Sequence, residues 1–247
     1  MRFSLSLQLK EQTFPIEYRK VILSYIKNAI SKCNNGKYYE EFFKDAKQKN
    51  YCFTVILPKS KFNKEEIALE KNEIKIIFST DNNLKTGFIL YNAFIAQKNK
   101  PYPLPNNNFM TLKSISNQKQ EEISNSRVIF KTTLGSGLCV RDHDIETNKD
   151  IYYVYSDEGF REKLSIVLTN QLLSAGFTKL EAEKVKVNPI QCKKVVAKHY
   201  RRYIDITTGI FEVQANNRIL QHFYDVGVGS RKSMGFGMID LVTQDLL

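Results

Sequence analysis

A short stretch near the carboxyl end of the chain, residues 225–242, combines backbone freedom with positive charge. Four of the 11 glycines fall within eleven positions: Gly227, Gly229, Gly235 and Gly237. Two cations and two hydroxyls stand between them: Ser230, Arg231, Lys232 and Ser233. Glycines permit positive φ angles and close backbone approach, and they leave N–H groups free for a phosphate. The composition therefore predicts a loop on which a phosphate chain lies.

The order of elements around this stretch separates it from the common nucleotide-binding loops. A helical pattern precedes the glycines and a strand pattern follows them, whereas Rossmann and P-loop motifs run strand, glycines, helix. The GKS or GKT sequence of a P-loop is absent. We therefore expect no nucleotide cofactor, and no other cofactor is predicted.

A second basic segment lies in residues 192–202, CKKVVAKHYRR. It contains no acid and five cations: Lys193, Lys194, Lys198, Arg201 and Arg202. Two antiparallel strands that turn near residues 198–200 would project these cations as a ridge, which could enter a nucleic-acid groove or follow a backbone. His199 would then be an RNA contact or simply exposed. An ordinary solvated hairpin is the alternative.

The overall charge points to the same class of partner. The 37 basic and 26 acidic residues give a formal charge of +11, and nucleic acid is the commonest polyanion that such a surface attracts. A lysine-rich proteome would give the same balance. We predict a nucleic-acid contact made by the basic hairpin and the glycine loop: Lys193, Lys194, Lys198, His199, Arg201, Arg202, Gly229, Ser230, Arg231 and Lys232.

Other site classes receive little support. The four cysteines are isolated, which argues against a zinc knuckle and a disulfide scaffold and fits a reducing cytosol. No apolar run is long enough to span a bilayer, so we expect a cytoplasmic protein without a membrane partner. Asp142, His143 and Asp144 are too local to form a convincing metal site, and no metal is predicted.

The helices and strands that must position these residues are predicted in the same order in both halves of the chain. In the first half, residues 3–9 alternate as a half-buried strand, and residues 16–33 have a helical period. Strands are expected at 51–57, 74–79 and 109–116, and a second helix is marked by Leu84, Phe88, Tyr91 and Ile95. This is the βαββαβ order of a ferredoxin-like domain.

The second half repeats that order. We expect a strand at 127–140, a helix with one apolar face from Phe160 to Ala175, strands at 185–197 and 200–213, a short helix around 219–224, and a last strand at 237–242. The predicted fold class is α+β, with two tandem ferredoxin-like domains. Residues 1–120 would form the first domain, and residues 121–247 the second, with the glycine-rich loop at 227–237.

The segment GVGSRKSMGFGMI resembles the carboxyl-terminal glycine-rich loop of the RAMP superfamily, most closely the CRISPR repeat-processing endoribonucleases, the sixth Cas protein. MRFSLSLQL, YIKNAI, YCFTVIL and FKTTLGSGLCVRD stand where that family has counterparts, so the resemblance covers nearly the whole chain. It implies two tandem ferredoxin-like domains that cut precursor CRISPR RNA within each repeat without a metal ion. The ribose 2′-OH would attack the adjacent phosphate and leave a 2′,3′-cyclic phosphate and a 5′-OH.

The chain departs from the family pattern at the catalytic group. Many members carry a catalytic histidine near the position of residues 42–45, but this chain has no histidine before His143. The chemistry requires in-line geometry, proton transfer and cations for the phosphorane charge. We predict that Lys44 and Lys47 stabilise charge or act as the acid, and that Tyr39 supplies a positioning hydroxyl.

Three functions remain open from the sequence. The first is a metal-independent endoribonuclease that binds CRISPR repeat RNA as precursor and product. The second is a non-catalytic RAMP-type RNA-binding subunit of a CRISPR effector complex, and the third is a basic protein–protein scaffold. Effector subunits and a second copy of the chain are left open as further partners.

Overall fold

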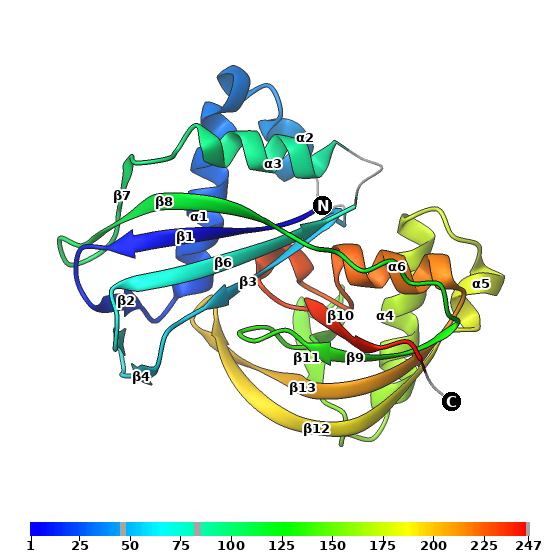
Figure 1. The fold of residues 1–247 in the computed structure, drawn as a ribbon. Coiled ribbons are helices and arrows are strands. Elements are labelled where there is room, and N and C mark those ends of the chain that lie inside the picture. The colour runs from blue at the N-terminus through cyan, green and yellow to red at the C-terminus, as the bar shows by residue number, and fades with distance from the viewer. Residues whose placement is uncertain (45–47, 82–84, 246–247) are drawn as a thin grey trace.

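The computed structural model describes residues 1–44, 48–81 and 85–245 of the chain. Figure 1 shows two α+β halves, each with a sheet that carries helices on one face. The sheet of the first half has the strand order β3-β6-β1-β8-β7, and that of the second half has the order β12-β13-β9-β14. Within the described residues no helix has the length and apolar character required to cross a bilayer.

The first half follows the predicted βαββαβ order and adds small elements to it. Its main elements are β1 (Arg2–Leu9), α1 (Tyr18–Lys32), β3 (Tyr51–Ile56), β6 (Glu73–Thr80), α3 (Thr86–Ile95) and β8 (Phe109–Gln118). The additions are β2 (Thr13–Pro15), η1 (Cys33–Gly36), α2 (Tyr39–Phe43), β4 (Ser60–Phe62), β5 (Glu66–Leu69) and β7 (Pro101–Pro103). Strand β1 is central because it pairs with both β6 and β8.

An aromatic cluster holds the helices of the first half against this sheet. Phe3 of β1 stacks on Phe78 of β6 with ring centroids 5.3 Å apart, and Phe94 of α3 lies 5.0 Å from Phe78. Tyr25 of α1 reaches Phe94 at 5.7 Å. All four side chains are fully buried, so their burial supplies a large share of the hydrophobic stabilisation of this half.

Helix α3 occurs where it was predicted, but its buried face is a different one. Phe88 and Ile95, which marked the predicted face, are 67% and 49% exposed, whereas Leu90, Ala93 and Phe94 are buried. Leu84 lies outside the described residues. The helix sequence TGFILYNAFI is apolar on nearly every side, so its period does not determine which face packs against the sheet.

The second half contains the other ferredoxin-like unit. Its elements are β9 (Arg127–Thr132), β10 (Val140–Asp144), β11 (Lys149–Tyr153), α4 (Phe160–Ser174), α5 (Lys179–Glu183), β12 (Lys186–His199), β13 (Arg202–Gln214), α6 (Asn217–Val226), η2 (Lys232–Met234) and β14 (Ile239–Thr243). Strand β9 pairs antiparallel with both β13 and β14 and is therefore an inner strand of this sheet. The predicted α+β fold with two tandem ferredoxin-like units is confirmed.

The prediction of a single strand over residues 127–140 is wrong. Strand β9 ends at Thr132, the chain turns, and β10 begins at Val140 and pairs with β11 instead of the main sheet. The turn is closed by a hydrogen bond from Ser136 N to Thr133 O (2.9 Å), and Gly135 adopts a φ of +80° that favours glycine. The apolar residues 138–140 that extended the predicted strand instead begin a new element.

The segment that joins the two units is packed against the second one. Gln120 Nε2 donates to Asp225 Oδ1 (2.9 Å), and the Ile123 N–H donates to Gln221 Oε1 (2.8 Å), which fixes residues 120–123 on α6. The predicted division at residue 120 lies in this segment and stays a prediction.

The two halves are tied by polar contacts between distant parts of the chain. Arg2 on β1 forms an ion pair with Asp240 on β14, and its Nη1 donates to Ile239 O. Thr54 Oγ1 on β3 donates to Leu134 O at 2.8 Å. Because Arg2 is only 6% exposed, its charge depends on Asp240 for compensation.

We therefore expect Asp240→Asn to lower the free energy of unfolding by about 2 kcal/mol, because it leaves the buried Arg2 guanidinium without its counter-charge. Glu212→Gln is the matched control, since it breaks the surface pair with the half-exposed Arg127 and should change stability little. Urea unfolding measures both variants. Equal effects of the two substitutions would contradict the role given to the Arg2–Asp240 pair.

Candidate functional site

The two glycine segments, 135–137 and 227–237, pack against each other backbone to backbone. The Gly237 N–H donates to Gly137 O, and the Val228 N–H donates to Gly237 O, both at 2.8 Å. A Cβ built on Gly237 would lie 2.2 Å from Val228 O, and φ at Gly237 is +74°. The glycines of the carboxyl-terminal stretch therefore serve positive φ and close backbone approach.

The backbone N–H groups of this loop bind within the protein. The Gly229 N–H donates to Gln171 Oε1 of α4 (3.0 Å), and the Ser230 N–H donates to Cys139 O (2.8 Å). Ser230 Oγ accepts from the Arg141 N–H at 3.4 Å. Gly229 and Ser230, predicted to contact RNA, thus use these donors to fix the loop on α4 and on the start of β10.

Arg231 is at the centre of a polar network on the inner side of the loop. Its Nη2 donates to Asp150 Oδ2 (2.9 Å), and its Nε donates to the Tyr152 hydroxyl (3.1 Å). Asp150 also accepts from Arg141 Nε (2.7 Å) and contacts His143 Nδ1 (2.8 Å). Burial alone would raise the pKa of Asp150, but the hydrogen bonds and charges of these neighbours outweigh it and hold that pKa well below its usual range.

His199 belongs to the same network. It is buried, its Nε2 lies 3.2 Å from Arg231 Nη1, and its ring meets those of Tyr200 (4.7 Å) and Phe236 (5.5 Å) edge-on. Burial, with the charge of Arg231, lowers its pKa to about 4, so the ring is neutral at pH 7. The expectation of an exposed His199 is wrong, and its proposed RNA contact stays a prediction.

Lys232, the other cation of the loop, points into the protein. Its side chain is only 6% exposed, and burial lowers its pKa to about 8. Within the described residues its ammonium group has neither a hydrogen bond nor an ion pair. In this conformation the Arg231 and Lys232 side chains both point into the protein. A phosphate chain on the outer surface of the loop would therefore not contact them, and the predicted phosphate contact requires an approach from the inner side of the loop.

The basic hairpin forms as predicted, with its turn one residue later. Tyr200 and Arg201 occupy the turn with φ of 48° and 64°, as two-residue hairpin loops require. The Arg201 N–H donates to Glu17 Oε1 at 3.0 Å, which brings the hairpin tip to the first half of the chain. The Arg201 and Arg202 side chains are exposed.

The lysines of β12 differ in their surroundings. Lys194 forms an ion pair with Asp205 at 2.6 Å, and Lys198 Nζ lies 6.0 Å from the centre of the Tyr203 ring. Lys193 and Lys198 line a cleft, whereas Lys194 does not. The hairpin thus places two of these three lysines in the wall of the cleft.

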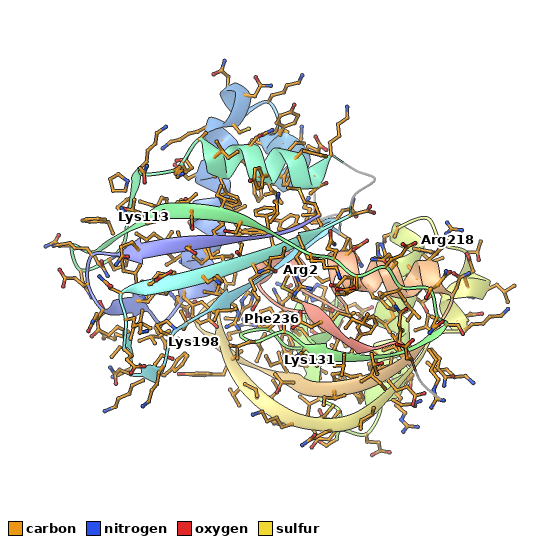
Figure 2. The ribbon with its side chains drawn as sticks, viewed as in Figure 1. Arg2, Lys113, Lys131, Lys198, Arg218 and Phe236 are labelled. Carbon is orange, nitrogen blue, oxygen red and sulfur yellow. The ribbon has the colours of Figure 1, made fainter. Side chains whose placement is uncertain are left out.

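This cleft has a volume of about 750 Å³ and lies between the two halves. Its walls come from α1, β4, residues 132–136 and the β12–β13 hairpin: Tyr18, Arg19, Phe62, Leu134, Lys198 and Tyr203 are among them. Figure 2 shows Lys198 where the hairpin approaches the first half, below Phe236. We name this cleft between the two halves the domain cleft.

The domain cleft combines cations with exposed apolar side chains. Leu134 and Tyr203 are each 71% exposed, and Arg19, Lys193 and Lys198 supply positive charge. Aromatic faces next to cations suit single-stranded nucleic acid, whose bases stack and whose phosphates are anionic. Sequence reasoning missed Arg19 because, between Glu17 and Lys20, it has the pattern of an ordinary charged residue at the start of a helix, far along the chain from the basic hairpin.

The predicted catalytic residues lie elsewhere. Tyr39 begins α2 and packs its ring 5.1 Å from that of Phe43, and Lys44 pairs with Glu40 at 3.3 Å on the surface. Lys47 lies outside the described residues. Figure 1 shows α2 beside α3, on the side of the first half that faces away from β12 and β13. The structure therefore brings neither Tyr39 nor Lys44 to the domain cleft.

The described residues contain no group of three histidine, cysteine, aspartate or glutamate side chains that could hold a metal. His143 is bound by Asp150, and His222 packs its ring 5.5 Å from that of Phe177. Burial lowers the pKa of His222 to about 4.

Comparisons with known proteins support the resemblance seen in the sequence. A model of the family described as CRISPR associated protein Cas6, C-terminal, matches residues 117–241. A solved structure described as an RAMP protein binding different RNA substrates is 18% identical, with a TM-score of 0.79 over 98% of this chain and 100% of its own. A Cas6-related protein from Pyrococcus furiosus is also 18% identical, with a TM-score of 0.79 over 99% of each chain.

A third solved structure, described as CRISPR associated protein Cas6, is 17% identical and has a TM-score of 0.73 over 98% of this chain and 99% of its own. At these identities the likeness shows the fold. No curated protein matches the chain.

The lowered pKa of His199 predicts how stability depends on pH. The unfolded histidine takes up a proton near pH 6.5, whereas the folded one does so only near 4, so acidification across this window favours unfolding. Acidification therefore lowers the free energy of unfolding, and we expect His199→Gln to remove the part due to this histidine, on the order of 2 kcal/mol at pH 4.5. Thermal or urea unfolding of both proteins between pH 7 and 4.5 measures the difference.

The comparison with the variant is needed because other groups titrate in the same window. His222 acts in the same direction, whereas burial raises the pKa of Asp225 to about 6, which stabilises the folded state as pH falls. His222 and Asp225 are present in both proteins, so their contributions to the pH dependence cancel when the variant is compared with the wild type. Parallel pH profiles for wild type and His199→Gln would contradict the burial of a neutral His199.

Proposed function

Because the chain belongs to the Cas6 family of CRISPR-associated proteins, we propose that it binds CRISPR repeat RNA and cleaves precursor CRISPR RNA into guide RNAs. At the level of the family, the activity is the binding and processing of CRISPR RNA. The specific proposal for this chain is a metal-independent cut by the ribose 2′-OH. A similar protein described as binding different RNA substrates supports an RNA partner.

The observation that carries the proposal is the domain cleft. It presents Arg19, Lys193 and Lys198 beside the exposed Tyr203 ring, and the exposed Arg201 and Arg202 continue the charge to the hairpin tip. A chain with a formal charge of +11 attracts RNA over a long range, and this cleft offers both phosphate and base contacts.

The reaction asks the protein to orient the strand and to balance charge. The 2′-OH attacks the adjacent phosphorus, its proton leaves, the P–O5′ bond breaks, and the departing 5′ oxygen takes a proton. Cations that lie against the phosphorane stabilise its extra negative charge. We assign this role to Lys44 and Lys47, with Tyr39 as the positioning hydroxyl, on the segment where many family members carry a histidine. Because this segment lies away from the domain cleft, the repeat strand would have to extend from the cleft to reach it.

The histidines of this chain do not replace that group. His199 is buried and neutral at pH 7, and His143 is held by Asp150. Because residues 38–49 contain no histidine, we expect a slow enzyme. The same observation favours the second candidate function, a non-catalytic RNA-binding subunit of a CRISPR effector complex. Effector subunits and a second copy of the chain stay predictions as partners.

RNA affinity should fall steeply with salt, because each neutralised phosphate contributes about −0.7 to the log–log slope for a single strand. If both hairpin arginines contact phosphates, the variant with Arg201→Ala and Arg202→Ala should flatten the slope by about 1.4. Arg127→Ala is the control, since its charge is already paired with Glu212. Fluorescence anisotropy between low and moderate salt gives the slopes, and an unchanged slope would place the RNA away from the hairpin tip.

Cleavage of the repeat RNA should proceed in EDTA and give a 2′,3′-cyclic phosphate, because the RNA supplies its own nucleophile. Lys44→Ala and Lys47→Ala should each slow single-turnover cleavage by roughly 10²-fold and change affinity only a few-fold. Lys179→Ala is the control, since Lys179 forms the same kind of exposed helical pair, with Glu183 at 3.6 Å.

Three outcomes separate the functions. Binding without any cleavage would support the RNA-binding subunit. A strict need for added Mg²⁺ would reject the 2′-OH mechanism. Full activity of both lysine variants would move the catalytic site away from residues 38–49.

A further inference from the structure

Arg19 carries a buried charge that no carboxylate of the described residues compensates. It stands in the first turn of α1 and is only 8% exposed. Its Nη2 donates to Gly135 O (3.1 Å), and its Nε donates to Gly235 O (3.5 Å). Burial lowers its pKa, which shows the cost of keeping the guanidinium charged at this place.

The rings around Arg19 orient the guanidinium. Its Cζ lies 4.4 Å from the centre of the Phe236 ring and 4.6 Å from that of Tyr18. These rings and the two glycine carbonyls fix the plane of the group. Its Nη1 makes no hydrogen bond within the described part of the chain, although a guanidinium supplies five N–H donors.

Arg2 provides a contrast within the same molecule. It is as deeply buried and also joins the two halves, but Asp240 neutralises it. A buried charge without such a partner is costly, and an anionic ligand would supply the missing opposite charge. Arg19 also lines the domain cleft together with Lys193 and Lys198, so an anion can approach it from solvent.

We propose that the Arg19 guanidinium is an anion anchor of the domain cleft, and that its free Nη1 binds a backbone phosphate of an RNA strand lying there. The proposal rests on the proposed RNA-binding function and names a contact within it. A planar guanidinium held in one orientation suits a phosphate, which accepts its hydrogen bonds in the same plane.

The bound phosphate would also affect the protein. Arg19 already holds the carbonyl groups of both glycine segments, and the phosphate would neutralise the charge that makes this position costly. RNA binding would therefore strengthen the contact between α1 and the glycine segments and raise the melting temperature of the whole chain. Because RNA bound anywhere on the folded chain would raise the melting temperature, the salt slope is what separates the anchor from a merely structural arginine.

The test compares Arg19→Gln with Arg2→Gln as the matched control, because both remove a buried arginine that joins the halves. The probe is a single-stranded oligouridylate, followed by fluorescence anisotropy over a range of salt. We expect Arg19→Gln to weaken binding by roughly tenfold and to flatten the log–log salt slope by about 0.7. Arg2→Gln should lose stability but keep the wild-type slope.

A second measurement needs no stable glutamine variant. The side-chain N–H resonance of Arg19 in the wild-type protein, assigned by its loss in Arg19→Lys, should shift when oligouridylate is added, whereas that of Arg2 should not. Inorganic pyrophosphate in place of RNA should produce the same shift at higher concentration if the phosphate is what Arg19 recognises.

The outcomes distinguish this inference from the function on which it rests. A wild-type protein that binds no RNA would reject the proposed function. Normal RNA binding with an unmoved Arg19 resonance, or with an unchanged salt slope in a folded Arg19→Gln variant, would overturn the anchor alone.

Discussion

The close contact between the two glycine segments is the constraint on which the rest of the site depends. A hydrogen bond of 2.8 Å joins Gly237 to Gly137, and a Cβ at Gly237 would lie only 2.2 Å from Val228 O within its own segment. Arg19 of the first half donates to the carbonyl oxygens of Gly135 and Gly235, and Thr54 donates to that of the neighbouring Leu134. These backbone oxygens thus join the two ferredoxin-like units, and residues 132–136 form one wall of the domain cleft.

The fold was predictable where hydrophobic pattern and local turns agree. The alternation at residues 3–9 marks β1, and the tip of the β12–β13 hairpin falls within one residue of its predicted place. The pattern failed where it was uniform. Helix α3 is apolar on most sides, so Phe88 could not be recognised as exposed, and the apolar residues after Gly137 hid the end of β9. In both cases tertiary packing decides what the local sequence leaves open.

The types of residue in the site could be predicted from the sequence, but the directions in which their side chains point could not. The sequence suggested that Arg231 and Lys232 face a ligand, but Asp150 and His199 bind Arg231 from within, and Lys232 is buried. Nothing near Asp150 in the sequence indicates a partner 81 residues away. Conversely, Arg19 enters the domain cleft because α1 packs on the glycine segments, a contact that arises only when the two halves have met.

The Arg2–Asp240 pair bears on how the chain reaches this structure during synthesis. The second residue finds its counter-charge only when position 240 has left the ribosome, and β1 stays at the edge of its sheet until β8 is made. Proteins whose contacts join such distant positions fold slowly, because much chain entropy is lost before these contacts form. We therefore expect the nascent first half to expose one side of β1 until β8 emerges, a period in which a chaperone could bind it.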